Sequence, residues 1–129
     1  MRLIFFQPKD FSCNILYYLA KILKFSDMVQ YNNCLFVWDQ QNSVLPSVFD
    51  DYFQNRNRCG YYLRTVANNN LTKPIKQTTF YGINSITYQS ISAWNNLPNE
   101  LKRNLSITCS KYLFKRALFE HFCSTYSDN

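Results

Sequence analysis

Glycine is almost absent from this chain, whose 129 residues contain only Gly60 and Gly82. Few positions can therefore adopt positive φ at no steric cost, and we expect asparagine to form many of the turns. The composition is otherwise that of a folded domain, with 47% apolar and 18% aromatic residues. A chain of this length forms about one domain and can bury a single core.

The N-terminal part shows helical periodicity. In residues 14–25 (NILYYLAKILKF) the large apolar side chains recur at helical spacing, and Lys21 and Lys24 fall mostly outside that stripe. This pattern predicts an amphipathic helix. A second helix is predicted to start from an N-cap at Ser26 or Asp27. The apolar stripe of the first helix consists of Ile15, Leu16, Leu19, Ile22 and Leu23.

The second helix is predicted to end at Trp38. After a polar connection, Pro46 is suited to open a further short helix, because its fixed φ matches a first helical turn. Aromatic side chains at such spacing are far more often core than binding surface. The short helix is predicted to bury Val48, Phe49, Tyr52 and Phe53.

The middle of the chain is irregular and basic. Helical periodicity fails over residues 54–77, and Pro74 interrupts any strand there. No acidic residue occurs between Tyr52 and Asn99, whereas five cations do. Cations that neutralise phosphates, next to rings that stack on bases, suit RNA or single-stranded DNA. The competing interpretation is a solvated basic loop beside packed tyrosines. The candidate nucleic-acid-binding residues are Arg56, Arg58, Arg64, Lys73 and Lys76, with Tyr61 and Tyr62 as candidate rings.

The next segment predicts a small β-hairpin and a corner. Residues 78–88 alternate loosely in polarity, with a turn expected at residues 82–84. The sequence Trp-Asn-Asn-Leu-Pro at residues 94–98 predicts a corner that places Trp94 and Leu97 in the core. Its proline restricts Leu97 to an extended conformation.

A final helix is predicted after a short helical turn over residues 98–103, with Ser106 as N-cap and a span from about 107 to 125. The predicted fold class is α+β and mostly helical, with N-terminal helices, a basic irregular loop, a small β-hairpin, the Trp-Asn-x-Leu-Pro corner and a C-terminal helix. We expect a single domain over residues 1–129, comprising a helical part at about 14–53, the basic loop at about 54–77, and the hairpin plus C-terminal helix at about 78–125.

Three motifs resemble one protein family when taken in order. Thr79 begins a T-x-x-G-x-x-S-I-x-Y run, Trp94 begins W-N-x-L-P-x-x-L-K, and Ser110 begins S-x-x-x-F-K-x-x-L. With this order the chain resembles the C-terminal region of LINE-type (jockey-like) non-LTR retrotransposon reverse transcriptases. Residues 61–64 also resemble the family's H-x-Y-x-[TL]-R signature, with Cys59 in the place of the histidine.

The resemblance implies an accessory role. The parent protein would be an RNA-directed DNA polymerase, with its catalytic palm and endonuclease upstream of this chain. No catalytic residue of the family occurs here, so we expect no enzyme activity from this chain by itself. Its divalent metal would belong to the parent polymerase, and we expect no cofactor in this chain. The implied partners are RNA or DNA and the upstream polymerase domains; the alternative is a degenerate retroelement remnant with a structural role or no independent function.

Other chemistry finds little support. Asp50-Asp51 is the one Asp-Asp pair, and its spacing from Phe49 differs from a Tyr-x-Asp-Asp polymerase hairpin. Five scattered cysteines and a single histidine do not form the closely spaced pairs of a structural zinc site. No segment has the length of a signal-peptide core or a membrane span. We therefore expect an intracellular protein, nuclear or cytoplasmic, with no membrane partner.

Overall fold

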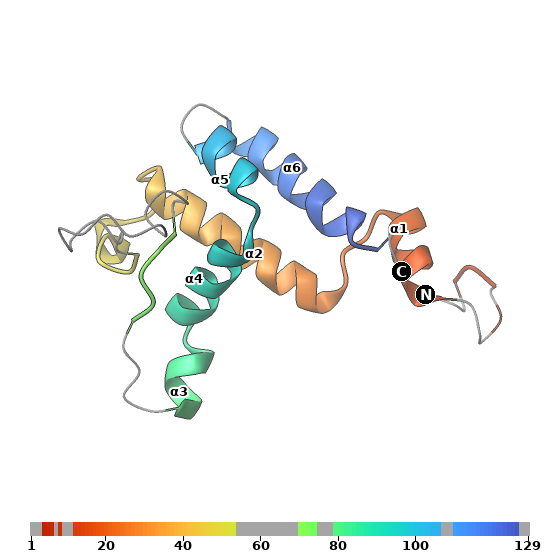
Figure 1. The fold of residues 1–129 in the computed structure, drawn as a ribbon, viewed down its shortest axis with the longest axis horizontal. Helices are drawn as coiled ribbons and strands as arrows, with labels where there is room; N and C mark the ends of the chain where they lie inside the picture. Colours follow the sequence, from red (N-terminus) through yellow and green to blue (C-terminus); the bar gives the residue numbers. More distant parts are fainter. Residues whose placement is uncertain are drawn as a thin grey trace.

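The structure is a computed structural model that describes residues 4–6, 8, 12–53, 70–74, 79–106 and 110–126, and of residues 79–81 and 103–106 the backbone alone. These residues form helices and no strand (Figure 1), which confirms a mostly helical fold over this part of the chain. The elements are α1 (Cys13–Ala20), α2 (Phe25–Gln41), a 3-10 helix η1 (Ser47–Phe49), α3 (Thr79–Asn84), α4 (Ile86–Asn96), α5 (Asn99–Ser106) and α6 (Lys111–Ser124).

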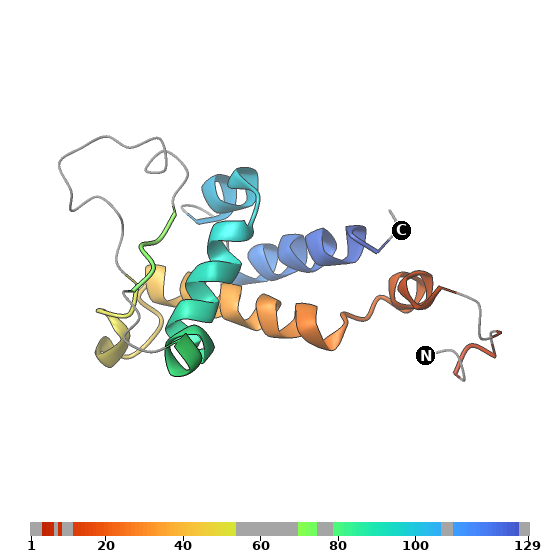
Figure 2. The ribbon, with the colours of Figure 1, turned by 60° about the horizontal axis from the view of Figure 1, so that its bottom comes forward.

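Helix α2 is the central element of the fold. Helix α4 crosses it with the most extensive contact, and α6 runs beside it (Figures 1 and 2). Trp38 of α2 stacks on Phe114 of α6 with ring centroids 5.7 Å apart, and Trp94 of α4 lies 6.1 Å from the same ring. Truncating a buried Trp or Phe to Ala typically costs about 3–5 kcal/mol. These three rings therefore hold the three helices together.

The predicted first helix is shorter than its apolar pattern. Helix α1 ends at Ala20 because Lys21 adopts a left-handed conformation (φ 51°, ψ 49°). The N–H groups of Lys21 and Ile22 then bond back to carbonyls of the last helical turn, an arrangement that usually has glycine at the left-handed position. The chain restarts as α2 at Phe25, so Ser26 and Asp27 lie inside its first turn, not at the N-cap.

Most of the predicted apolar stripe in α1 is exposed. Leu16 is buried and Leu23 packs against the core, as expected. However, Ile15, Leu19 and Ile22 are 38%, 63% and 50% exposed, so most of this stripe does not pack against the core. The break at Lys21 is the reason, because it turns α1 away from α2 and only the edge of α1 reaches α6 (Figure 2).

The short helix after Pro46 forms as the single turn η1. Of the four side chains predicted to be buried, Phe53 is buried, Phe49 is half-buried, and Val48 and Tyr52 are 74% and 40% exposed. Phe36 of α2 explains the difference, because its ring meets the rings of Phe49 and Phe53 edge-on at centroid distances of 5.5 and 5.4 Å. Only the side of this turn that faces Phe36 is covered.

The predicted β-hairpin over residues 78–88 is wrong. Helix α3 and the start of α4 occupy this segment. Ser85 separates the two helices, and its hydroxyl accepts a hydrogen bond from the Tyr88 N–H as the N-cap of α4. The buried residues of α4 follow helical spacing against α2, so tertiary packing outweighs the β-propensity of the isoleucines and tyrosines. These buried residues are Ser90, Ile91, Ala93 and Trp94.

The corner prediction is confirmed, with the helix boundaries shifted. Helix α4 ends at Asn96, and Leu97 before the proline is extended (φ −66°, ψ 148°). Trp94 and Leu97 are 0% and 5% exposed. Helix α5 then runs through Ser106, which is therefore not the N-cap of the last helix. Helix α6 starts later than predicted, after Ser110. None of the described helices combines the length and apolar character needed to cross a membrane.

Candidate nucleic-acid interface

Lys73 is the one predicted nucleic-acid-binding residue that the structure describes. It lies in the short segment 70–74, and its side chain is exposed. Its ammonium nitrogen is 5.2 Å from the centroid of the Tyr88 ring, on the first turn of α4. Both residues belong to the acid-free interval, so the structure joins a cation and a ring of that interval in a cation–π contact. The other predicted residues lie outside the described residues: Arg56, Arg58, Arg64, Lys76, Tyr61 and Tyr62.

Asn95 fixes the segment that carries Lys73. Its Nδ2 donates to the Leu71 carbonyl oxygen at 3.0 Å, and its Oδ1 accepts from the Leu71 N–H at 2.9 Å. The Leu71 side chain is 2% exposed and belongs to the core. One amide side chain thus satisfies both backbone groups of Leu71, which would otherwise need a neighbouring strand.

Lys102 is a second polar anchor at the same place. Its side chain, from α5, is 1% exposed, and its Nζ donates to Asn70 Oδ1 at 2.9 Å and to the Asn95 carbonyl oxygen at 2.8 Å. Both acceptors are neutral, and no carboxylate pairs with Lys102 among the described residues. The Asn95 carbonyl lies in the last turn of α4, where a cation is favoured by the helix dipole.

The environment of Lys102 shifts two ionisation equilibria. Burial lowers the pKa of the Lys102 ammonium, and the neighbouring Cys34 partly opposes this. Burial raises the pKa of the Cys34 thiol to about 12, which the Lys102 charge partly offsets. Cys34 is fully buried in α2, so its thiol is neutral and packs as an apolar group.

The W-N-x-L-P-x-x-L-K motif therefore forms one structural cluster. Trp94 and Leu97 enter the core, Asn95 holds Leu71, and Lys102 joins Asn70 to the end of α4. Sequence reasoning gave no binding or anchoring role to Asn95 and missed Lys102 altogether. Their only signal was their place in the motif, since both look like ordinary surface residues in a helical pattern.

The flanks of the basic interval reach the same core. Phe53, on one side of residues 54–69, and Leu71, on the other side, both belong to the core cluster. Asn70 is tied to Lys102 and Leu71 to Asn95. The chain is therefore attached to the helices on both sides of residues 54–69, and Lys73 lies just beyond the second attachment.

The Asp50-Asp51 pair lies at the end of the single turn η1. Asp50 and Asp51 are exposed, and Asp50 has helical backbone angles at the end of η1, as predicted from Pro46. In the part of the chain that the structure describes, no three His, Cys, Asp or Glu side chains are grouped to hold a metal ion. Burial lowers the pKa of His121 and raises that of Cys123, which keeps both groups neutral near pH 7.

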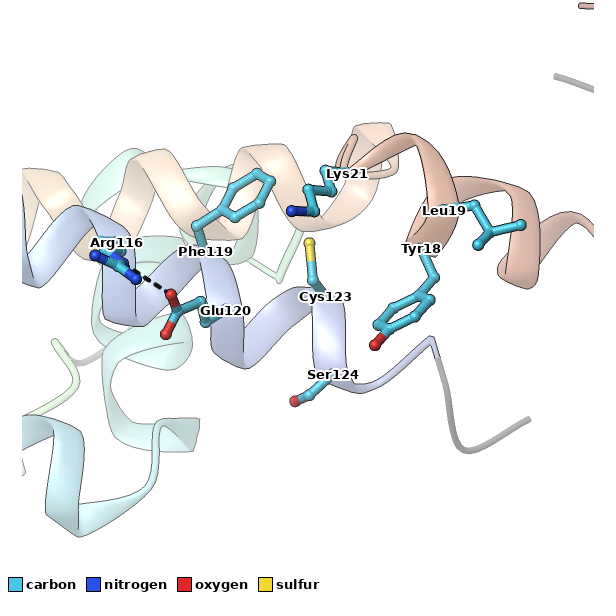
Figure 3. A pocket seen from close by; sticks show the side chains of 8 residues that line it. All are labelled: Tyr18, Leu19, Lys21, Arg116, Phe119, Glu120, Cys123 and Ser124. Carbon is cyan, nitrogen blue, oxygen red and sulfur yellow. Dashed lines mark hydrogen bonds and ion pairs between the residues drawn. The ribbon is translucent and has the colours of Figure 1, made fainter.

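A pocket of ≈ 460 Å³ lies between α1 and α6, away from the motif cluster (Figure 3). The rings of Tyr18 and Phe119 and the charged side chains of Lys21, Arg116 and Glu120 line it. Arg116 Nε donates to Glu120 Oε1 at 2.9 Å within α6. No sequence pattern predicted this pocket, because it depends on the break at Lys21 that separates α1 from α2.

Comparisons with protein-family models, with curated proteins and with solved structures find no match to this chain.

Proposed function

We propose that this chain is the C-terminal accessory part of a LINE-type retrotransposon RNA-directed DNA polymerase that lacks the polymerase active site and helps to hold template RNA or target DNA. The observation that carries the proposal is the acid-free interval from Tyr52 to Asn99, with its five cations and interleaved tyrosines. The order of the three family-like motifs supports the parentage, and the contact between Lys73 and Tyr88 supports the pairing of cations with rings.

Three of the described acids are engaged by other side chains, whereas Asp50, Asp51 and Glu100 are exposed. Asp39 is neutralised by Lys111, Asp27 accepts a hydrogen bond from Tyr126, and Glu120 is paired with Arg116. These three carboxylates have partners within the chain, and the chain has a formal net charge of +6. An excess of unpaired cations attracts nucleic acid through its phosphates.

The proposed mechanism is phosphate neutralisation with base stacking. Each phosphate of a single strand that a cation neutralises releases counterions, and steepens the dependence of log affinity on log salt by about 0.7. Rings beside the cations add stacking that tolerates any base. The bound strand would lie along the predicted basic loop, residues 54–77, which follows Phe53 and is attached to the core again at Leu71.

The test is RNA binding as a function of salt. The variant with Arg56, Arg58, Arg64, Lys73 and Lys76 all replaced by Ser should bind a single-stranded RNA more weakly and with a flatter salt slope. A matched pair of single variants, Lys73→Ser and Lys115→Ser, locates the effect, because both lysines are exposed and Lys115 lies on α6. Lys73→Ser should flatten the slope and Lys115→Ser should not. An unchanged slope in the fivefold variant would refute the proposal.

The second candidate is a degenerate retroelement remnant with a structural role or no independent function. The hydrogen bonds of Asn95 and Lys102 favour this candidate, because they stabilise the helices whether or not a nucleic-acid strand is bound. Sequencing the transcript through its 5′ end separates the two candidates. An in-frame palm with Tyr-x-Asp-Asp upstream favours the polymerase, and stop codons in the upstream frame favour the remnant.

A further inference from the structure

Contacts of Tyr126 join the elements that border the pocket between α1 and α6. Leu16 of α1 is 1% exposed, and the ring of Tyr17 lies 6.3 Å from the ring of Tyr126, just after α6. The Tyr126 hydroxyl accepts from the Lys24 N–H at 3.1 Å and donates to Asp27 at the start of α2. The contact between Tyr17 and Tyr126 joins α1 to the end of α6, and the two hydrogen bonds of Tyr126 join that end to the start of α2.

The pocket combines apolar rings with one unpaired cation. Tyr18 projects from α1 and Phe119 from α6, on either side of the space (Figure 3). The Lys21 ammonium reaches toward the gap between Phe119 and Cys123 (Figure 3). No carboxylate pairs with Lys21 in the parts of the chain that are described.

The other charges of the pocket cancel. Arg116 is bonded to Glu120, so together they contribute no net charge. Lys24, the next lysine after Lys21, places its ammonium 4.6 Å from the Tyr126 ring centroid, outside the pocket lining. A ligand that complements this surface therefore has a flat or apolar body and a single anionic group close to it.

We propose that this pocket binds one nucleotide of a single strand, with the base against Tyr18 and Phe119 and the phosphate on Lys21. The volume of ≈ 460 Å³ lies within the range typical of small-molecule sites. Stacking on aromatic rings with a cation at the phosphate is how proteins hold unpaired bases. This inference rests on the proposed nucleic-acid binding and adds a second contact to it, on a different part of the chain.

The experiment uses AMP and adenosine as probes in a titration of the full chain followed by amide NMR shifts. AMP should shift the amides of Tyr18, Lys21, Phe119 and Cys123, and adenosine should bind about tenfold more weakly because it lacks the charge-assisted contact. Lys21→Gly should reduce AMP affinity about tenfold and leave adenosine unchanged. Glycine suits the left-handed backbone at this position, so this variant keeps the end of α1.

Matched variants distinguish the stacking contribution of the Tyr18 ring from an effect on folding. Tyr18→Ala should weaken AMP at least about fivefold, and Tyr18→Phe should retain it, since the ring provides the stacking. Lys21→Gln tests the charge a second time with a side chain that is uncharged but still polar, and Lys115→Ala is the control on the exposed part of α6. Equal binding of AMP and adenosine, shifts confined to other residues, or no shift at all would overturn the inference.

Three further outcomes test the pocket proposal separately from the proposed binding by the basic loop. If a labelled single-stranded RNA of about ten nucleotides binds wild type and Lys21→Gly equally well, the pocket is not a nucleotide site, and the proposed binding by the basic loop is retained. If AMP binds the pocket while the fivefold Ser variant retains its salt slope, the pocket stands and the basic interval falls. If an acidic amphipathic peptide shifts these amides and AMP does not, the pocket is a protein-docking site and the nucleotide proposal is wrong.

Discussion

The side-chain amide of Asn95 pairs with the backbone of Leu71 in both directions, donating at 3.0 Å and accepting at 2.9 Å. A neighbouring β-strand would supply the same two bonds, but here they come from the last turn of helix α4. The contact positions segment 70–74, and with it Lys73, against Tyr88. The geometry of the candidate interface thus depends on a residue that does not itself face the partner.

Asn95→Ala should lower the free energy of unfolding by about 1–3 kcal/mol, because the Leu71 N–H and carbonyl both lose their partner. The control is Asn96→Ala, one residue further and exposed, which should change stability by less than about 0.5 kcal/mol. Urea unfolding followed by tryptophan fluorescence measures both. Equal effects would mean that the Asn95 bonds contribute nothing beyond helix propensity.

Lys102→Met should leave stability at pH 7 within about 1 kcal/mol of wild type, because replacing a buried charge by an apolar side chain of similar volume is often neutral. Lys102→Ala should cost about 2–4 kcal/mol through the cavity it leaves. If the two variants prove equally unstable, the hydrogen bonds to Asn70 and Asn95 outweigh packing.

A comparison of wild type with Lys102→Met over a range of pH also tests the ionisation of Lys102. Its pKa is lowered in the folded state from the ordinary 10.5, so the unfolded state binds more protons between the two values. Wild type should therefore gain stability relative to Lys102→Met as pH rises toward 10.5. Cys34 is present in both proteins, so much of its opposite trend cancels. A difference that is flat with pH would contradict the burial of a charged ammonium.

Tyr126→Phe should destabilise the fold by about 1–2 kcal/mol, because the hydroxyl donates to Asp27 and accepts from the Lys24 N–H. Burial and Asp27 raise the pKa of Tyr126 from 10.0 to about 12, so the advantage of wild type should be constant below pH 10 and shrink between pH 10 and about 12. Tyr112→Phe is the matched control, since Tyr112 is 69% exposed on α6. A comparable loss in the control would point to a general effect of removing a tyrosine hydroxyl.

Asp39 and Lys111 should show a measurable coupling energy across α2 and α6. The Lys111 ammonium lies 2.7 Å from both carboxylate oxygens, and Asp39 is only 15% exposed. A double-mutant cycle with Asp39→Asn and Lys111→Met should give about 1 kcal/mol at low salt. The same cycle for Arg116 and Glu120, on the surface of α6, should give less and vanish sooner with salt. The reverse ranking would show that burial of Asp39 does not strengthen its pair.

The sequence predicted what depends on local rules. Pro98 forces Leu97 to be extended, so the corner is correct in place and in its two buried side chains. The existence of helices at both ends of the chain followed from periodicity. Asparagine was expected to form many of the turns. Among the described residues, however, those with positive φ are Phe6, Lys21 and Ser43, and none of them is an asparagine.

What the sequence could not give depends on contacts between distant residues. The segment 78–88 has the composition of a hairpin, but residues 79–84 and 86–88 are helical, and Ser90 and Ile91 further along α4 are buried against α2. Ser90 Oγ donates to Asn33 Oδ1 at 3.3 Å, a bond that no local pattern announces. The same holds for the candidate site: Lys73 was singled out, but its contact with the Tyr88 ring depends on Asn95 and Leu71.

Phe53 and Leu71 attach the chain to the core on either side of residues 54–69. Phe53 packs against Phe36 of α2, and Leu71 is held by Asn95, so each flank has its own contacts with the core. Lengthening a connection costs little free energy, roughly 0.6 kcal/mol for each doubling. We therefore expect a longer connection between these two anchors to cost the described helices little stability, which makes it a place where added sequence can be tested.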